Sequence, residues 1–456
     1  MPTAAMKFRL AGLVAAVVLA GAGSASAGAD AGGAPSRPAV DSPELAQLGP
    51  FAVGVRTLTL VDHKAVDLIA PGQDRKLRVD IWYPARIAKG AKLETYHATL
   101  PAEVPGKPVA FSMPGLAARN ARPVDGHYPL VIVSHGRSNA TVALSWLTEN
   151  LASKGYVVAA IRHQDLARNN PLEGPEILLR RPLDIAFVAR SLQGAAAIRG
   201  LIDPERIALI GYSMGGYGVL TAAGAVLDPR GDAGKWVPGG LLLPYARGGK
   251  QQESIRVPHL KAVVALSPWG GKVWGLDGLA GITTPLLLIA GDRDHTVDYA
   301  SGARGFFEGA TGARRYLLTF KGAGHALGFG PVPAQMSKRV WDISWFEDPV
   351  WRKDRIIGIN LHMITAFLDR FVKGDESRAA YLDGLVEDSN SGRWSAPPDA
   401  PFDAISSGGE GTTLWKGFQR DYAEGLELLR RDAQAPAAPA PATPEPGKPA
   451  PAPANP

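Results

Sequence analysis

Short apolar runs that end in glycine or polar residues recur along the central part of the chain. Segments with the spacing of helices separate most of these runs, so the two kinds of segment alternate. Continuous apolar runs of this length suit strands that are buried on both faces of a parallel sheet. The pattern therefore predicts a doubly wound α/β fold. The runs are YPLVIVSHG, GYVVAAIRH, RIALIGYS, KAVVALSPW, TPLLLIAGD and RRYLLTFKG.

An earlier part of the chain follows another pattern. VGVRTLTLVD (53–62) and KLRVDIWYPA (76–85) alternate apolar and polar residues, which is typical of half-buried strands. We expect them to form an antiparallel N-terminal pair beside the mostly parallel sheet. Ligand sites in such sheets form beyond the carboxyl ends of the strands. Residues that follow the apolar runs are therefore the first candidates for chemistry.

The N-terminal residues have the features of an export signal. Lys7 and Arg9 precede an apolar run over 10–20, and small residues end at Ala27. This predicts a secretory signal peptide over 1–27, cleaved near Ala27, and a periplasmic or secreted bacterial protein. The apolar run is short for a bilayer span, and no other stretch reaches about 18 uninterrupted apolar residues. We expect no membrane span in the mature protein.

Composition divides the rest of the chain. Residues 28–50 are rich in Gly, Ala, Ser and Pro, which predicts a flexible leader. Residues 433–456 form a Pro/Ala-rich tract that cannot build a core, which predicts a disordered tail. One folded domain is expected over 51–432, and segments 227–258 and 331–351 are interpreted as cap insertions over its cleft.

Charge and cysteine content exclude several function classes. The net charge is +6, but Lys and Arg are scattered and aromatic residues do not interleave with them, so no nucleic-acid partner is expected. The chain has no cysteine, which excludes disulfides, thiolate metal sites and a cysteine nucleophile. Any nucleophile must therefore be an oxygen or an amine.

One motif supplies such an oxygen. RIALIGYSMGGYGVL predicts a buried strand, a tight turn and the start of a helix, with Ser213 between Gly211 and Gly215. Glycines on both sides leave room for a strained turn that lifts the hydroxyl above the sheet. Short Gly/Ser strings also arise by chance, and the alternative is an idle serine in a structural turn. The flanking strand and helix favour a nucleophile.

A serine needs a base that an acid orients. Asp294 follows the run that ends at Gly291, and His325 follows the next run. Ser213, Asp294 and His325 thus occur in the chain order of α/β-hydrolase triads. Asp292 is the alternative acid, but we expect it to stabilise its own turn.

The other eight histidines are weaker candidates for the base. His163 precedes the serine in the chain and is expected to line or pack the cleft. His295 directly follows the acid, and His362 lies in an apolar helix-like segment, where a core position is expected. His135 lies where a backbone donor is needed. The remaining four lie outside strand ends of the right order: His63, His97, His127 and His259.

Two backbone N–H groups are predicted to form the oxyanion hole. The first belongs to Met214, the residue after the nucleophile at the start of a helix. The second belongs to Arg137, in the SHGRS segment after an earlier strand. An ordinary glycine turn is the alternative for that segment.

Taken together, these motifs resemble the α/β-hydrolase superfamily, specifically its secreted serine esterases related to platelet-activating-factor acetylhydrolase and described as dienelactone-hydrolase-like. The resemblance covers about residues 52–383, and GYSMGG also resembles the nucleophile turn of cutinases and polyester hydrolases. It implies an α/β-hydrolase fold and ester hydrolysis through an acyl-serine intermediate, without cofactor or metal. It also implies a small-molecule or lipid-like ester as substrate. True dienelactone hydrolases use a cysteine nucleophile, which this chain lacks.

Tryptophans concentrate around the strand ends and the insertions. We expect some to line an apolar pocket under a lid formed by 235–249, although core packing is the alternative for each. Trp236, Trp269 and Trp274, with His163, are the predicted substrate-binding residues. The cluster also contains Trp341, Trp345 and Trp351.

The expected function is therefore a serine esterase. A peptidase or an acyl transferase could use the same three residues, and amide turnover would distinguish these from an esterase. A non-catalytic binding protein on a hydrolase scaffold is the alternative from another class.

Overall fold

A computed structural model describes most of the chain: residues 38–63, 65–101, 107–198, 200–231, 235–275, 277–395, 411–419 and 422–434. The predicted signal peptide, the first part of the leader (28–37) and the tail from 435 onward lie outside the described residues. Within the described ranges, no helix is long and apolar enough to cross a membrane.

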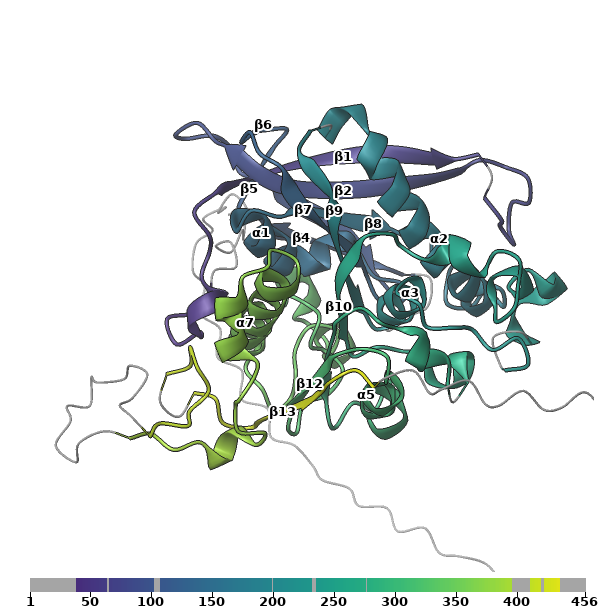
Figure 1. The fold of residues 1–456 in the computed structure, drawn as a ribbon. Coiled ribbons are helices and arrows are strands. Elements are labelled where there is room, and N and C mark those ends of the chain that lie inside the picture. The colour runs from purple at the N-terminus through teal and green to yellow at the C-terminus, as the bar shows by residue number, and fades with distance from the viewer. Residues whose placement is uncertain are drawn as a thin grey trace, which may run out of the picture. The chain divides into compact units, whose positions relative to one another are not determined.

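The centre of the domain is an eleven-stranded mixed sheet (Figure 1). Its middle strands are mutually parallel in the order β12-β11-β10-β9-β7-β8. Each predicted apolar run forms one of these strands, which confirms the doubly wound parallel sheet. The strands are β7 (Tyr128–Ser134), β8 (Val157–Arg162), β9 (Ile202–Tyr212), β10 (Leu260–Leu266), β11 (Leu286–Gly291) and β12 (Arg315–Phe320).

The two alternating segments form the predicted antiparallel pair. Strand β1 (Ala52–Asp62) pairs with β2 (Arg75–Arg86), and β2 continues the sheet by pairing antiparallel with β8. Short strands β5 (Ala117–Arg119) and β6 (Arg122–Pro123) extend this end of the sheet.

Like β5 and β6, three further strands have no counterpart in the sequence prediction. Strands β3 (Thr95–Leu100) and β4 (Val109–Pro114) form a separate antiparallel pair. Strand β13 (Leu426–Arg431) pairs antiparallel with β12 and forms the opposite edge of the main sheet.

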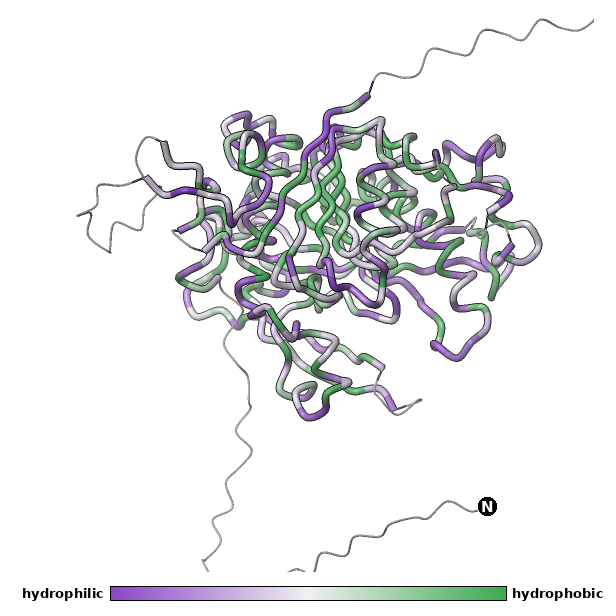
Figure 2. The backbone as a smooth tube through the Cα atoms, turned by 90° about the horizontal axis from the view of Figure 1, so that it is seen from below, coloured by the Kyte–Doolittle hydropathy of each residue, from purple (hydrophilic) through white to green (hydrophobic). Residues whose placement is uncertain are grey.

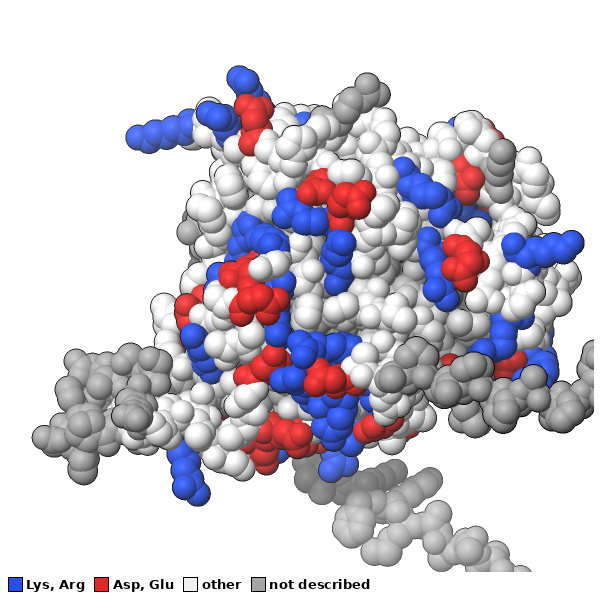
Figure 3. Space-filling model, in the orientation of Figure 1, with Lys and Arg blue, Asp and Glu red and all other residues white. Residues whose placement is uncertain are grey.

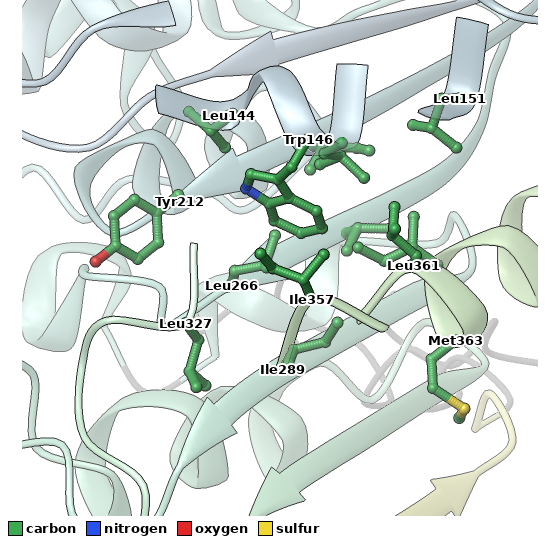
Figure 4. Close-up of a cluster of buried hydrophobic side chains, with 14 of the residues drawn as sticks. Leu144, Trp146, Leu151, Tyr212, Leu266, Ile289, Leu327, Ile357, Leu361 and Met363 are labelled. Carbon is green, nitrogen blue, oxygen red and sulfur yellow. The ribbon is translucent and has the colours of Figure 1, made fainter. Parts of the chain in front are cut away.

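Helices cover both faces of the sheet (Figure 1). Because successive side chains of a strand point to opposite faces, Val131 and Val133 pack in one hydrophobic cluster, and Leu130 and Ile132 pack in the other. Figure 2 shows the green apolar strands running through the interior, and Figure 4 shows Trp146 in the first cluster. Helices α1 (Ser145–Ser153) and α7 (Lys353–Phe371) cover the first cluster, and α2 (Glu173–Gly194), α3 (Met214–Ala222) and α5 (Gly305–Gly309) cover the second.

A proline inside α2 helps to join two of these helices. Pro182 has no N–H, so the carbonyl of Leu178 lacks its usual helical donor. The hydroxyl of Tyr217, on α3, donates to that carbonyl at 2.8 Å. Helix α3 thereby compensates for the proline of its neighbour.

The flexible leader predicted for 28–50 is wrong for its second half. Residue Ala46 is fully buried, and its carbonyl accepts a hydrogen bond from Asn150 of α1 at 2.9 Å. The N–H of Leu45 donates to His362 of α7 at 3.1 Å. Residues 38–50 are thus fixed against both helices, because the short apolar element η1 (Glu44–Ala46) fits between them.

The segments interpreted as insertions contain short helices. Residues 227–258 include η4 (Pro238–Gly240), η5 (Leu243–Tyr245) and η6 (Gln252–Ile255), and residues 331–351 include η10 (Ala334–Met336) and α6 (Val340–Ile343). Within the predicted lid, Val237, Leu242 and Tyr245 are buried in the second hydrophobic cluster. These three side chains therefore anchor the lid segment to the domain. The side chain of Trp236, in the same segment, is half exposed.

Charged side chains of both signs lie next to one another on the face shown in Figure 3. Ion pairs among the described residues include Arg370 with Asp383 at 2.7 Å and Lys373 with Asp369 at 2.8 Å. The positive net charge is therefore dispersed over this face and does not form one basic patch.

Candidate active site

The nucleophile turn has a strained backbone. Ser213 joins β9 to α3 with φ 53° and ψ −118°, a conformation that residues with a side chain rarely adopt. Its neighbours must be glycines, because a Cβ on Gly211 would lie 2.3 Å from the carbonyl oxygen of Gly215. A Cβ on Gly215 would lie 2.0 Å from the carbonyl oxygen of Ser134. The two glycines therefore let the helix start directly against the strands.

Ser213, His325 and Asp294, the three residues predicted as a triad, lie in hydrogen-bonding contact at the carboxyl ends of β9, β12 and β11. The Nε2 atom of His325 lies 3.1 Å from Oγ of Ser213, and its Nδ1 lies 2.6 Å from Oδ2 of Asp294. A carboxylate accepts, so Nδ1 carries the proton and Nε2 is free to accept the serine proton. The other oxygen of Asp294 accepts the N–H groups of Thr296 and Val297, both at 2.9 Å.

The alternative residues have other contacts. Asp292 accepts the N–H of Gly322 at 2.6 Å, so its side chain binds the loop after β12 and not its own turn as expected. His295 is exposed, and His362 is buried between Leu45 and the carbonyl of Lys416. In the part of the chain that the structure describes, no group of three or more His, Asp or Glu side chains is arranged to hold a metal ion.

The loop that carries His325 is fixed by a series of side-chain donors that the sequence analysis missed. Four consecutive backbone carbonyls, from His325 to Gly328, each accept one such donor. Two donors, Lys353 and Asn360, lie seven residues apart on α7, so their spacing on one face of an apolar helix is the signal that could have identified them. The donors are Tyr212 Oη, Lys353 Nζ, Asn360 Nδ2 and Trp146 Nε1.

Lys353 is the charged member of this series. Its side chain is buried, and burial lowers its pKa to about 8, although Glu347 and Asp348 act in the opposite direction. Asp348 also accepts the N–H of Gly324 at 2.7 Å. The backbone is therefore held on both sides of His325: Asp348 binds the N–H of Gly324, and Lys353 binds the carbonyl of Ala326.

The residues of the two predicted oxyanion donors line the same cavity as Ser213. Met214 is the first residue of α3, and Arg137 follows β7 in the same cavity. Gly136 packs so closely that a Cβ there would lie 3.3 Å from Cβ of Ser213. Among the described residues, no protein group accepts a hydrogen bond from the N–H of Met214 or of Arg137. Both N–H groups therefore remain available for a ligand oxygen.

Ser213 and His325 open into a cavity of about 800 Å³. Aromatic side chains form much of its wall, and the guanidinium of Arg168 lies 4.8 Å from the ring centre of Trp345. Trp236 and Trp269 line it as predicted, and Trp341 and Trp345 from the second insertion line it as well. The aromatic wall consists of Tyr212, Trp236, Trp269, Phe329, Trp341 and Trp345.

The prediction that Trp274 and His163 line the pocket is wrong. Trp274 is fully buried, stacks on Tyr217 with ring centres 5.7 Å apart, and donates to the Thr221 hydroxyl at 3.0 Å. His163 is also buried, between Ser134 at 2.9 Å and Asp184 at 3.1 Å. Burial lowers the pKa of His163 to about 4, so it is neutral near pH 7. Both residues follow or lie near strand ends, but their side chains point into the helix layer.

Trp351, the last of the clustered tryptophans, also packs inside the domain. Its ring meets Phe320 edge-on at 5.0 Å between centres, and its Nε1 donates to the Lys321 carbonyl. A position near a strand end therefore does not distinguish the tryptophans that line the cavity from those that pack inside the domain.

Comparisons with known proteins find similar sequences and folds. Two family profiles match parts of the chain: PET hydrolase-like over residues 121–230, and platelet-activating factor acetylhydrolase, isoform II, over residues 46–169. The bis(hydroxyethyl) terephthalate hydrolase of Streptomyces coelicolor is 27% identical over 225 residues, which are 49% of this chain and 57% of that protein. Cutinase 2 of Thermobifida cellulosilytica is 26% identical over 223 residues, 48% of this chain and 68% of that protein.

Solved structures include a ferulic acid esterase from Streptomyces cinnamoneus, with 21% identity and a TM-score of 0.47, covering 71% of this chain and 91% of that one. The chain spans little more than half the length of the first curated relative. Its sheet order and nucleophile turn are those of the α/β-hydrolase fold. The two family profiles and the relatives support the resemblance to serine esterases seen in the sequence.

Proposed function

We propose that the protein is a carboxylic-ester hydrolase in which Ser213, His325 and Asp294 form the catalytic triad. The observation that carries the proposal is the continuous contact from Ser213 through His325 to Asp294, with distances of 3.1 and 2.6 Å, at the floor of an open cavity. The names of the relatives, cutinases and a bis(hydroxyethyl) terephthalate hydrolase, support the same reaction.

The proposed reaction begins when Oγ of Ser213 attacks the ester carbonyl carbon and His325 accepts the serine proton. The N–H groups of Met214 and Arg137 stabilise the negative oxygen that develops. Asp294 stabilises the imidazolium and keeps Nδ1 protonated. The imidazolium then gives its proton to the departing alcohol. Water, activated by the same histidine, releases the acid from Ser213.

The cavity wall suggests the substrate class. Aromatic rings stack on planar groups and exclude water, so the proposed substrate is an ester with a bulky apolar or aromatic part. Replacing Trp345 with Ala is expected to raise KM for an aromatic ester such as bis(hydroxyethyl) terephthalate several-fold. It should affect ethyl acetate much less, because that ester has no aromatic part to stack on the ring. Equal effects on both esters would remove this assignment.

One set of measurements tests the catalytic proposal. A fluorophosphonate probe is expected to label the wild type and not the Ser213→Ala variant, and hydrolysis of p-nitrophenyl butyrate should be lost with the label. A matched p-nitroanilide measures amide turnover, and added alcohols measure acyl transfer. An unlabelled, inactive wild type would instead favour a binding protein on a hydrolase scaffold.

We also propose that the protein is exported. The support is the sequence of residues 1–27, with its basic start, apolar run and small residues before position 28. Mass spectrometry of protein recovered outside the cytoplasm should find an N-terminus at residue 28. An N-terminus at residue 1 in that material would contradict the proposed cleavage.

A further inference from the structure

A buried arginine lies beneath the loop that carries the second oxyanion donor. Arg181, on α2, is 1% exposed, so its guanidinium is removed from solvent. One terminal nitrogen donates to the carbonyl of His135, and the other donates to the carbonyl of Gly136 at 3.2 Å. The second nitrogen also contacts Asp165 at 2.6 Å. A single side chain thus binds two successive carbonyls of the loop.

The Gly136 carbonyl determines the direction of the Arg137 N–H. These two groups belong to one peptide unit, and in a trans peptide the C=O and N–H bonds point in opposite directions. All described peptide bonds are trans. Arg181, together with Nδ1 of His135 at 2.7 Å, draws the carbonyl toward the domain interior. The N–H of Arg137 is thereby directed away from Arg181, and Arg137 lines the cavity.

Asp165 fixes the following residue. Its Oδ2 accepts the N–H of Ser138 at 2.9 Å, and Ser138 has φ 53°, in the left-handed region. The oxygen that holds Ser138 is the same one that pairs with Arg181. The ion pair therefore binds the loop on both sides of the Arg137 peptide unit. The side chain of Arg137 is held separately by Glu173, the first residue of α2.

We propose that Arg181 and Asp165 are positioning residues that fix and polarise the oxyanion donor of Arg137; this inference rests on the proposed function. The guanidinium cation next to the Gly136 carbonyl withdraws electron density from that peptide unit, which strengthens the opposite N–H as a donor. Neither side chain is in the group that lines the cavity, so they act through the backbone and without touching substrate.

The test compares Arg181→Lys and Asp165→Asn with wild type. Lysine keeps the charge but cannot reach both carbonyls and Asp165 at once. Asparagine keeps an acceptor for Ser138 but removes the ion pair. Active sites are counted by fluorophosphonate titration, so that kcat refers to folded protein only. Arg370→Lys is the matched control, because Arg370 is also buried and paired, with Asp383 at 2.7 Å, away from this loop.

Both loop variants are expected to lower kcat for p-nitrophenyl butyrate about 10- to 100-fold, somewhat less than removal of a whole oxyanion donor. KM should stay within about twofold, because the ground-state ester needs the donor less than the transition state does. Affinity for a boronic acid that forms a tetrahedral adduct with Ser213 should fall by a similar factor. The Arg370→Lys variant should keep kcat.

Two results would overturn the inference. If kcat per titrated site in both loop variants equals that of Arg370→Lys, the ion pair only stabilises the fold. If Arg181→Lys does not fold, Asp165→Asn alone decides, and an unchanged kcat and boronic acid affinity would count against the proposal. A wild type that neither labels nor hydrolyses esters would reject the proposed function itself, and that is settled before any variant is made.

Discussion

Ser213 keeps an unfavourable backbone conformation because two glycines and several backbone hydrogen bonds surround it. Its N–H donates to the Leu266 carbonyl at 2.9 Å, and its own carbonyl accepts the N–H of Gly216 at 2.8 Å. Positive φ at a residue with a side chain costs on the order of 1–3 kcal/mol, which the surrounding contacts must offset. The position of the hydroxyl at the cavity is thus a consequence of the packing between β9 and α3.

Replacing Gly215 with Ala tests this packing. The new methyl group would overlap the Ser134 carbonyl, so we expect destabilisation of about 3 kcal/mol or more and loss of ester hydrolysis. Urea unfolding and fluorophosphonate labelling measure the two effects. Gly194→Ala is the control, because no heavy atom lies within 4 Å of its added Cβ. A folded, active Gly215→Ala variant would show that the turn can relax.

The identity of the acid is a second prediction for single residues. Asp294→Asn is expected to lower kcat by about four orders of magnitude, because the amide favours the wrong imidazole tautomer. KM should change little. Asp292→Asn is the matched control, since Asp292 contacts Gly322 and not His325. A large loss for Asp292→Asn with a nearly normal Asp294→Asn would reverse the assignment.

At the scale of elements, α7 connects the core to the loop of the proposed base. Lys353→Met removes the donor to the Ala326 carbonyl, and we expect kcat to fall about tenfold because His325 loses part of its support. Lys154→Met is the control: Lys154 is also a buried lysine, but it donates to Leu45 and Thr365. Equal kcat values per titrated site in the two variants would show that Lys353 only stabilises the helix.

The elements also show what the sequence can and cannot predict. Buried strands produce continuous apolar runs whatever lies beside them, so six strands and the nucleophile turn were predictable. Strand β13 was missed because the apolar residues of Leu426–Arg431 are interrupted by Glu427 and followed by two arginines. Trp274 and His163 were misplaced because a position near a strand end does not tell which way a side chain points. Ala46 is buried because it packs against helices far along the chain, and a local sequence pattern cannot predict such a long-range contact.

At the scale of the whole molecule, buried neutral histidines make stability depend on pH. Burial lowers the pKa of His163 to about 4 and of His362 to about 3, and holds the pKa of His135 well below its usual range. The unfolded chain takes up protons near pH 6.5, whereas the folded chain does not. Stability is therefore complete above pH 6.5 and falls as the pH drops toward the folded-state pKa values.

Between pH 6.5 and 5, each such histidine is expected to reduce the free energy of unfolding by about 2 kcal/mol. Urea unfolding at several pH values measures this slope. His362→Gln should lower stability at pH 7 but flatten the slope, because glutamine does not titrate. A pH-independent free energy of unfolding in the wild type would contradict the prediction.

Strand β13 has a consequence for self-association. It supplies hydrogen-bond partners along β12, the strand that leads to His325, and it ends with Arg430 and Arg431. Proteolysis that removed residues 426–434 would leave the N–H and C=O groups of β12 unpaired beside an apolar layer, a template on which a second molecule could add a strand. Trimming of the C-terminal part of the domain should therefore convert a dispersed protein into aggregates.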